Sequence, residues 1–231
     1  MTEKTVGVLG GMGPEATVDF FAKIVSLTPA NRDQNHLRII IDNNPKIPDR
    51  TDAILNKKKS TLISAFVETG KNLERAGVDF ISIPCNTVHY FYNELVKEIS
   101  VPALHMIKEV TKAIKRTAPN CKSVGLLATS GTVTSGLYQK ECQQVGIEVI
   151  TPGGQGQASV MQAIQKIKAG IKPATRRTML KEAHRLLENG AEALILGCTD
   201  IPLVIKTGDF PLPVFDSNLV LAEATVKFAR S

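Results

Sequence analysis

Length, composition and charge exclude several classes of protein. The chain has 231 residues, of which 43% are hydrophobic and 22% charged, with 17 Gly and 12 Pro, and this composition excludes disordered, collagen-like and fibrous proteins. Its formal net charge of +6 is mild, and no apolar run approaches the roughly 18 residues needed to span a bilayer, which excludes a transmembrane helix.

The predicted elements alternate between short strands and amphipathic helices. A buried strand is expected at 6–9, then a Gly-rich turn at 10–13 and a helix that begins at Pro14. The residues expected on the buried face of this helix are Thr17, Phe20, Phe21, Ile24 and Leu27. A second strand follows at 37–41, a Pro- and Asn-rich loop at 42–51, a helix at 62–75 and a third strand at 78–84. This alternation predicts an α/β protein whose parallel sheet is covered on both faces.

An internal repeat divides the chain into two similar halves. Cys85 and Cys198 each end an apolar strand, and each is preceded by a Gly eight residues earlier, with an acidic residue two positions after that Gly. The strand at 6–9 has a counterpart at 124–127, and short apolar strands containing Pro follow at 101–104 and 212–215. The chain is therefore expected to form two similar parallel-sheet α/β domains.

The two matched cysteines stand where open parallel sheets bind their ligands. Cys85 precedes the amphipathic stretch 88–99, and Cys198 precedes a predicted helix with Pro202 in its first turn. The positive end of a helix dipole is expected to lower the pKa of each thiol. A lone cysteine at a strand end is more often inert packing, but the shared register favours a function. If an approximate twofold axis relates the halves, both thiols face one cleft from opposite sides.

The remaining cysteines and the histidines receive no functional role. Cys121 and Cys142 have no matching register and are expected to be structural. The four cysteines form no C-x-x-C pair and have no His at ligand spacing, so we expect reduced thiols, no disulfide and no metal site. His89, His105 and His184 are expected on helix surfaces or in the core.

Five ordered motifs resemble the aspartate racemases of the Asp/Glu racemase superfamily. They are VLGGMGP at 8–14, NNP with PDRT at 43–51, PCNT at 84–87, LATSGT at 127–132 and GCT at 197–199. The resemblance implies two domains related by pseudo-twofold symmetry, 1–106 with 217–231 and 107–216, with the active site in the cleft between them. It also implies a homodimer, catalysis without pyridoxal phosphate or another cofactor, and a last helix near 219–229 that packs on the first domain.

The chemistry of racemisation agrees with a cysteine pair. Inverting an α-carbon requires removal of its proton on one face and delivery of a proton on the other, so Cys85 and Cys198 are predicted to be the acid and base. Without a cofactor, the carbanion must be stabilised by donors and cations on the carboxylate oxygens. Donors near the predicted strand ends are Asn86, Thr87, Thr129, Ser130, Thr132 and Thr199.

Two cations and two further positions complete the predicted substrate site. From spacing alone Arg50 and Lys168 are solvated, but Arg50 could hold a carboxylate bidentately, and the resemblance places a substrate-binding Lys at Lys168. Together they would recognise the second carboxylate of a dicarboxylic amino acid. Met12 and Asp200 stand where glutamate racemases carry an Asp-Ser pair and a His, which favours aspartate. Asp200 replaces the Glu of many relatives and could equally cap a helix.

Other functions and partners stay open. The segment 11–16 also matches a dinucleotide fingerprint, with Asp42 as the ribose-binding acid, which would suit an NAD-dependent oxidoreductase but leaves the duplicated cysteines unexplained. A broader Asp/Glu racemase and a non-catalytic amino-acid sensor are further alternatives. Basic residues are dispersed apart from the triplet 57–59, which is expected on a solvated helix face, so small anions are favoured over nucleic acid. The start lacks the segments of a signal peptide, and we expect a cytoplasmic protein.

Overall fold

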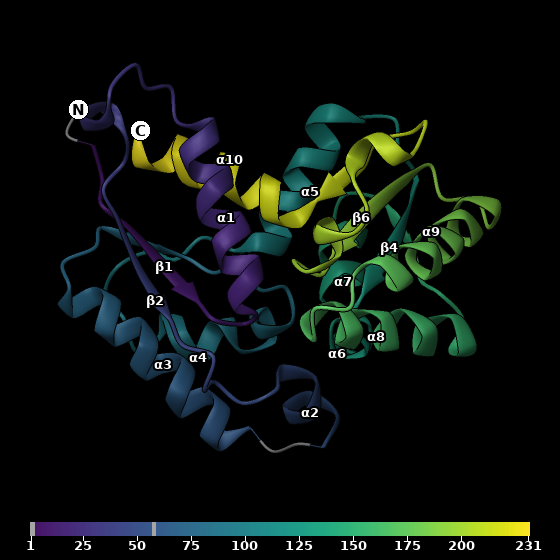
Figure 1. Ribbon diagram of the computed structural model, residues 1–231, viewed down its shortest axis with the longest axis horizontal. Coiled ribbons are helices and arrows are strands. Elements are labelled where there is room, and N and C mark those ends of the chain that lie inside the picture. The colour runs from purple at the N-terminus through teal and green to yellow at the C-terminus, as the bar shows by residue number, and fades with distance from the viewer. Residues whose placement is uncertain (1–2, 57–58) are drawn as a thin grey trace.

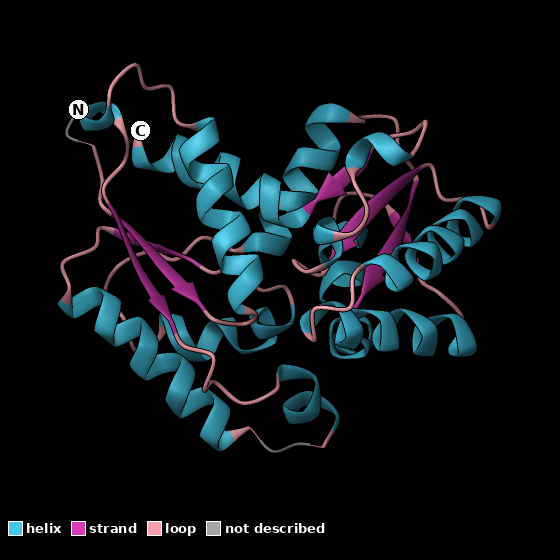
Figure 2. Cartoon of the chain, viewed as in Figure 1, coloured by secondary structure: helices cyan, strands magenta, loops and turns pink. Residues whose placement is uncertain are grey.

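The computed structural model describes residues 3–56 and 59–231 and contains two parallel β-sheets, each covered by helices (Figure 1). Figure 2 shows the strands as two separate groups. Of the basic triplet, Lys57 and Lys58 lie outside the described residues, and Lys59 is exposed just before a helix. None of the helices in the described ranges combines the length and apolar character needed to cross a membrane.

The first sheet has the order β2-β1-β3, and its strands are β1 (Val6–Gly10), β2 (Ile39–Asn43) and β3 (Phe80–Ser82). The second sheet has the order β5-β4-β6-β7, with β4 (Ser123–Ala128), β5 (Glu148–Ile150), β6 (Ala193–Gly197) and β7 (Val214–Asp216). The internal repeat is visible in the register, because Val6 pairs with Phe80 in the first sheet and the equivalent Val124 pairs with Ala193 in the second. Each half therefore has an equivalent strand pair, β1 with β3 in the first and β4 with β6 in the second.

Ten α-helices and four short 3₁₀ helices connect these strands in the described part of the chain. The α-helices are α1 (Pro14–Leu27), α2 (Arg50–Leu55), α3 (Ser60–Arg75), α4 (Tyr92–Val96), α5 (Met106–Thr117), α6 (Ser130–Ser135), α7 (Leu137–Gln143), α8 (Gly154–Lys168), α9 (Pro173–Glu188) and α10 (Ser217–Ala229). The 3₁₀ helices are η1 (Asp33–Asn35), η2 (Thr87–Phe91), η3 (Ile201–Leu203) and η4 (Thr207–Asp209).

Each sheet is a middle layer between two helical layers. In the first half, α1 and α10 share a core with Val6 and Val8, while α3 packs with Leu9 on the other face. In the second half, α5 and α7 share a core with Val124, and α8 and α9 pack against Leu127. Because both faces are covered, β1 and β4 are buried along their whole length, as predicted for parallel strands.

The last helix returns to the first half of the chain. α10 lies beside α1 (Figure 1), where the Asn218 amide donates to the Ala16 carbonyl at 3.2 Å and Lys23 pairs with Asp216 at 2.9 Å. This is the packing that the family resemblance implies for the last helix, and α10 also contacts α5. The domain boundaries after residues 106 and 216 stay predictions.

Four local predictions were wrong. The strand expected at 78–84 covers only β3, and the single helix expected at 88–99 is replaced by η2 and α4. Phe21, expected in the core, is 41% exposed and lies with the exposed Val18 and Val25 on one flank of α1. The expected strand at 101–104 is reduced to one bridge, between Ala103 and Ile81 of β3.

Candidate active site

One pocket of about 280 Å³ is lined by residues of both halves. From the first half, the predicted site residues that line it are Met12, Arg50, Cys85, Asn86 and Thr87. From the second half they are Thr129, Lys168, Cys198 and Thr199. Ser130, Thr132 and Asp200 do not line this pocket. The structure therefore brings nine of the twelve predicted residues to one cavity.

The two cysteines reach this cavity from equivalent strands. Cys85 follows β3 by three residues and is 5% exposed, and its N–H donates to the Ile83 carbonyl at 2.8 Å. Cys198 directly follows β6 and is 6% exposed. A hydrogen bond joins their loops, since the Thr199 hydroxyl donates to the Pro84 carbonyl at 3.3 Å. Both thiols thus lie at the carboxyl ends of strands paired with the central strands β1 and β4.

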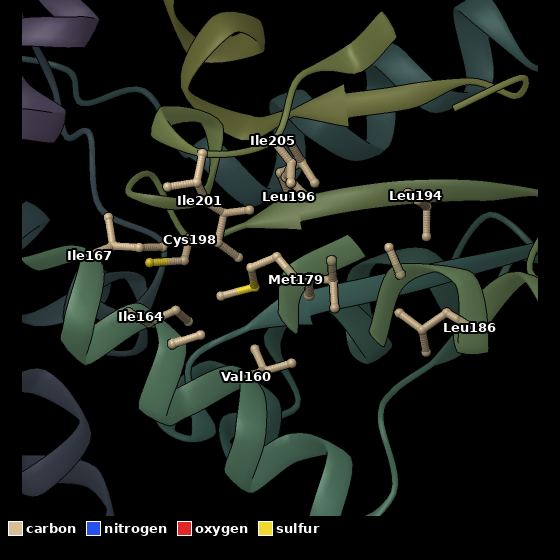
Figure 3. Packing of buried hydrophobic residues seen from close by; sticks show 14 of the residues in the cluster. Val160, Ile164, Ile167, Met179, Leu186, Leu194, Leu196, Cys198, Ile201 and Ile205 are labelled. Atoms are coloured by element: carbon tan, nitrogen blue, oxygen red, sulfur yellow. The ribbon is translucent and has the colours of Figure 1, made fainter. Parts of the chain in front are cut away.

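The environment of Cys198 favours the protonated thiol. Its sulfur lies within the apolar cluster that includes Ile164 and Ile167 (Figure 3), and its S–H points to the Asp200 carboxylate, with Sγ 3.6 Å from Oδ2. Burial, followed by the charge of Asp200, raises the pKa of Cys198 to about 12, although Lys168 opposes this shift. The predicted lowering of the pKa of this thiol was therefore wrong. The helix after it, η3, has only three residues and offers little dipole against burial and a neighbouring carboxylate.

Lys168 and Asp200 form an ion pair next to Cys198, since Asp200 contacts both side chains. Lys168, the last residue of α8, donates to Asp200, which is 2% exposed. Burial opposes the charge of Lys168, but the Cys198 thiolate, when it forms, and the Asp200 carboxylate raise its pKa above the ordinary value. Asp200 stands at the N-cap position of η3, as the alternative interpretation allowed, but its side chain makes no capping hydrogen bond. A Cβ at Gly13 would lie 3.5 Å from both Lys168 Nζ and Asp200 Oδ1, so the turn after β1 closes over this pair.

Arg50 lines the pocket from the start of α2. It begins α2, and its Nη1 donates to the carbonyls of Ile47 at 3.2 Å and Pro48 at 3.1 Å. Its Nε is buried and has no hydrogen-bond partner among residues 3–56 and 59–231. Arg50 therefore lines the pocket with a guanidinium whose hydrogen bonding is incomplete.

The predicted hydroxyl and amide donors are largely bonded to one another. The hydroxyl of Thr87 lies 2.9 Å from those of Thr129 and Thr132, which joins η2 to α6. The Asn86 amide donates to Ser217 at 2.9 Å and accepts from Tyr138 at 2.7 Å. Thr132 is fully buried in this network. Ser130 lies in a neighbouring hollow and accepts from Gln157 at 3.4 Å. These groups build the joint between the halves, and only some of them also face the pocket.

Sequence reasoning missed several residues that line the pocket. α2 and its preceding residue contribute Asp49, Asp52 and Leu55, and α8 contributes Met161, Ile164 and Gln165. Met161, Ile164, Gln165 and Lys168 stand at helical spacing on one face of α8, so the position of Lys168 was a signal that could have identified the other three. Within the two described ranges, no three His, Cys, Asp or Glu side chains are arranged to hold a metal ion.

The glycines of the dinucleotide-like turn have a structural explanation. Gly11 adopts φ +91, and a Cβ there would lie 2.3 Å from the backbone carbon of Asn44. Asp42, the expected ribose ligand, accepts a hydrogen bond from Asn72 at 3.2 Å. Gly11 is therefore required by the close approach of two loops.

Fold and site together define an enzyme of two α/β halves whose duplicated thiols line one pocket. The chain matches the family Asp/Glu/Hydantoin racemase over residues 9–225. It belongs to this family, and is an isomerase of the amino-acid racemase class. The match to a racemase family argues against the oxidoreductase hypothesis.

Individual relatives agree with this assignment. The chain is 32% identical over 225 residues to the broad specificity amino-acid racemase RacX of Bacillus subtilis, with 96% of each chain covered. It superimposes on the structure of Picrophilus torridus aspartate racemase with a TM-score of 0.88 and 36% identity, covering 98% of this chain and 94% of that one. It is also 29% identical to the glutamate racemase of Aquifex pyrophilus, over 75% of this chain and 68% of that protein.

Proposed function

We propose that this enzyme interconverts L-aspartate and D-aspartate without a cofactor. Cys85 and Cys198 act as the two acid/base groups that remove a proton from the α-carbon and return one to it. The observation that carries the proposal is that the two cysteines of the repeat line a single pocket. One thiolate removes the α-proton and the opposite thiol donates a proton to the other face of the carbanion, so the electron pair left by the first proton takes up the second. The roles exchange for the other enantiomer.

The protonation of Cys198 supports its role as an acid in this reaction. The raised pKa of Cys198 makes it the proton donor at neutral pH, with its S–H directed to Asp200. A proton donor with a high pKa holds its proton until a strongly basic carbanion forms next to it. Lys168 retains its charge beside Cys198 and provides local stabilisation when that thiol becomes a thiolate.

Carboxylate recognition is the basis for choosing aspartate. Arg50 and Lys168 are cations on opposite halves, and both residues line the pocket. An amino acid with two carboxylates fits two such cations better than an amino acid with one. The structural similarity to Picrophilus torridus aspartate racemase supports the same substrate.

A broader substrate range is the second candidate, and one specific feature favours it. Leu55, Met161 and Ile164 line the pocket, and such apolar side chains also suit substrates without a second carboxylate. The Bacillus subtilis relative with 32% identity is named a broad specificity amino-acid racemase. Glutamate and a set of neutral amino acids therefore belong in the first assay.

The deciding experiment incubates L-aspartate and D-aspartate separately with fresh, reduced enzyme in heavy water. Optical rotation should decay to zero from both sides, and the α-proton signal should disappear from the NMR spectrum. Racemisation of glutamate or neutral amino acids at similar rates would replace aspartate by the broader range. Retained rotation together with a retained α-proton for every amino acid would reject the proposal.

The proposal extends to assembly and location. We place the enzyme in the cytoplasm as a homodimer that acts on a free dicarboxylic amino acid. Sedimentation of the purified chain tests the dimer, and fractionation of the cells that produce it tests the location.

A further inference from the structure

His89 makes two hydrogen bonds to the backbone, and one of them ends on Cys85. Its Nδ1 lies 2.7 Å from the Cys85 carbonyl oxygen, and its Nε2 lies 3.0 Å from the Met106 N–H. A backbone N–H can only donate, so Nε2 must accept and Nδ1 must carry the proton that it donates to Cys85. Both bonds therefore require the neutral ring with its proton on Nδ1.

The surroundings of His89 hold the ring in this state. The side chain is 3% exposed, and burial lowers the pKa of His89 to about 4, so the ring is neutral at physiological pH. It stacks parallel to Tyr92, with ring centroids 5.8 Å apart, and contacts His105 at 4.8 Å. The Tyr92 hydroxyl donates to the Ala103 carbonyl at 2.6 Å, and Ala103 pairs with β3. The imidazole is thus packed against backbone that the sheet fixes.

The second half of the repeat has no such residue. Four positions after Cys198 stands Pro202, where the first half has His89. The Cys198 carbonyl accepts instead from the Ile201 N–H at 3.0 Å, a bond within an ordinary turn. Of the two cysteine carbonyls, only that of Cys85 therefore accepts from a side chain within the described residues, and loss of this bond should affect one thiol and leave the other intact.

We propose that His89 is a positioning residue that orients Cys85 through its Nδ1–H and ties the cysteine loop to the start of α5 at Met106. The inference rests on the proposed two-base reaction only for its kinetic readout. His89 does not line the pocket and has no contact with substrate in this assignment.

Two variants separate the two bonds. In His89→Asn the side-chain amide occupies the place of Nδ1 and can still donate to Cys85, but the bond to Met106 is lost. In His89→Gln the side-chain oxygen occupies the place of Nε2 and can accept from Met106, but the donor to Cys85 is lost. Both should lower the melting temperature. Only His89→Gln should lower kcat strongly, by about 10- to 100-fold, because small displacements of a reacting group have effects of that size.

Isotope effects report which thiol has been disturbed. With α-deuterated substrates, a slower Cys85 should increase the isotope effect in the direction in which Cys85 removes the deuteron. It should decrease the effect in the reverse direction, in which Cys198 does so. Cys85→Ser and Cys198→Ser calibrate the two directions, since their asymmetries should be opposite. His89→Gln should follow Cys85→Ser, and Tyr92→Phe, which keeps the ring stacking, should resemble the wild type.

Equal kinetic losses in His89→Asn and His89→Gln, or isotope effects that change equally in both directions, would overturn the inference and leave His89 a packing residue. A second readout needs no substrate, namely the rate of iodoacetamide alkylation at Cys85 and Cys198, followed by peptide mass spectrometry. His89→Gln should change the rate at Cys85 at least about threefold and leave Cys198 unchanged. This result would support the inference even if aspartate is not racemised, whereas unchanged alkylation at Cys85 would reject it.

Discussion

The two cysteine loops occupy equivalent places in the repeat, but they are supported by different chemistry. Cys85 has a neutral imidazole on its carbonyl, 2.7 Å away, and no carboxylate contact to its sulfur within the described residues. Cys198 has an ordinary backbone turn behind it, while its sulfur faces Asp200 at 3.6 Å with Lys168 beside that carboxylate. The duplicated strands place both thiols, and unduplicated residues control the orientation of one and the protonation of the other.

This difference suits the proposed racemisation. Either enantiomer can be the product, but in each direction one thiol acts as the base and the other as the acid. The proposed reaction needs two thiols that face one carbon from two sides, and the shared strand register brings both cysteines to one pocket. At any moment one thiol must be a base and the other an acid, so identical environments would serve the reaction poorly. We expect the following changes to affect the two halves unequally.

The largest effect is expected from removal of either sulfur. Cys85→Ala and Cys198→Ala should each lower racemisation of aspartate by about 10²- to 10⁴-fold, the range that a general acid or base provides. Polarimetry measures the loss, and NMR in heavy water should still detect slow α-exchange from one enantiomer in each variant. Cys142→Ala is the matched control, because this thiol is buried away from the pocket. A variant at Cys85 or Cys198 that keeps a tenth of the activity would contradict the two-base reaction.

The buried imidazole of the first half should make stability depend on pH. The pKa of His89 falls from 6.5 to about 4 on burial, so the unfolded chain binds more protons between these values and stability decreases as the pH falls through that window. The cost at pH 4 is about 3 kcal/mol of unfolding free energy. Urea unfolding at pH 7, 5.5 and 4.5 should show this decline. Urea unfolding of His89→Gln should show a shallower decline, and the part that remains is expected from His105, whose pKa burial lowers to about 3. An equally steep decline in the variant would assign the effect to other groups.

Carboxylate recognition by the first half should depend on the geometry of Arg50. Arg50→Ala should raise KM for aspartate by about 10- to 100-fold, the value of a charge-assisted hydrogen bond. Arg50→Lys should recover little of this, because an ammonium cannot reproduce the fork of donors. Steady-state kinetics provides the measurement, with Arg177→Lys on the exposed face of α9 as the control. Unchanged KM in Arg50→Ala would remove Arg50 from the substrate site.

The sequence was sufficient for those parts of the fold that repeat or alternate. The helix start at Pro14, the parallel character of both sheets and the common pocket of Cys85 and Cys198 follow from apolar periodicity and from the internal duplication. The helix expected at 88–99 failed for a local reason. Its first turn is rich in β-branched and aromatic residues, which are weak helix formers, and His89 is bonded to Cys85 and Met106.

Properties that depend on contacts between distant segments could not be predicted. Lys168 and Asp200 are 32 residues apart, and only the folded chain shows that they neutralise each other beside Cys198. The pKa of Cys198 was predicted in the wrong direction because strand position indicates neither burial nor a facing carboxylate. His89 was given no role, since a histidine near a cysteine has no recognisable periodicity from which its hydrogen bonds can be inferred.

The smallest effect is expected from substitution of Asp200, whose carboxylate faces Cys198. Asp200→Asn removes the negative charge next to Cys198 and leaves Lys168 to act on the sulfur alone, so the pKa of Cys198 should fall. Alkylation of Cys198 at pH 8 should become about 5- to 10-fold faster, because reactivity follows the thiolate fraction, while Cys85 in the same sample serves as the control. Mass spectrometry of the alkylated peptides measures both rates. Slower alkylation of Cys198 would show that Asp200 acts mainly as the acceptor that removes the proton of Cys198. The contrast between Cys85 as the oriented thiol and Cys198 as the protonated thiol would then have to be abandoned.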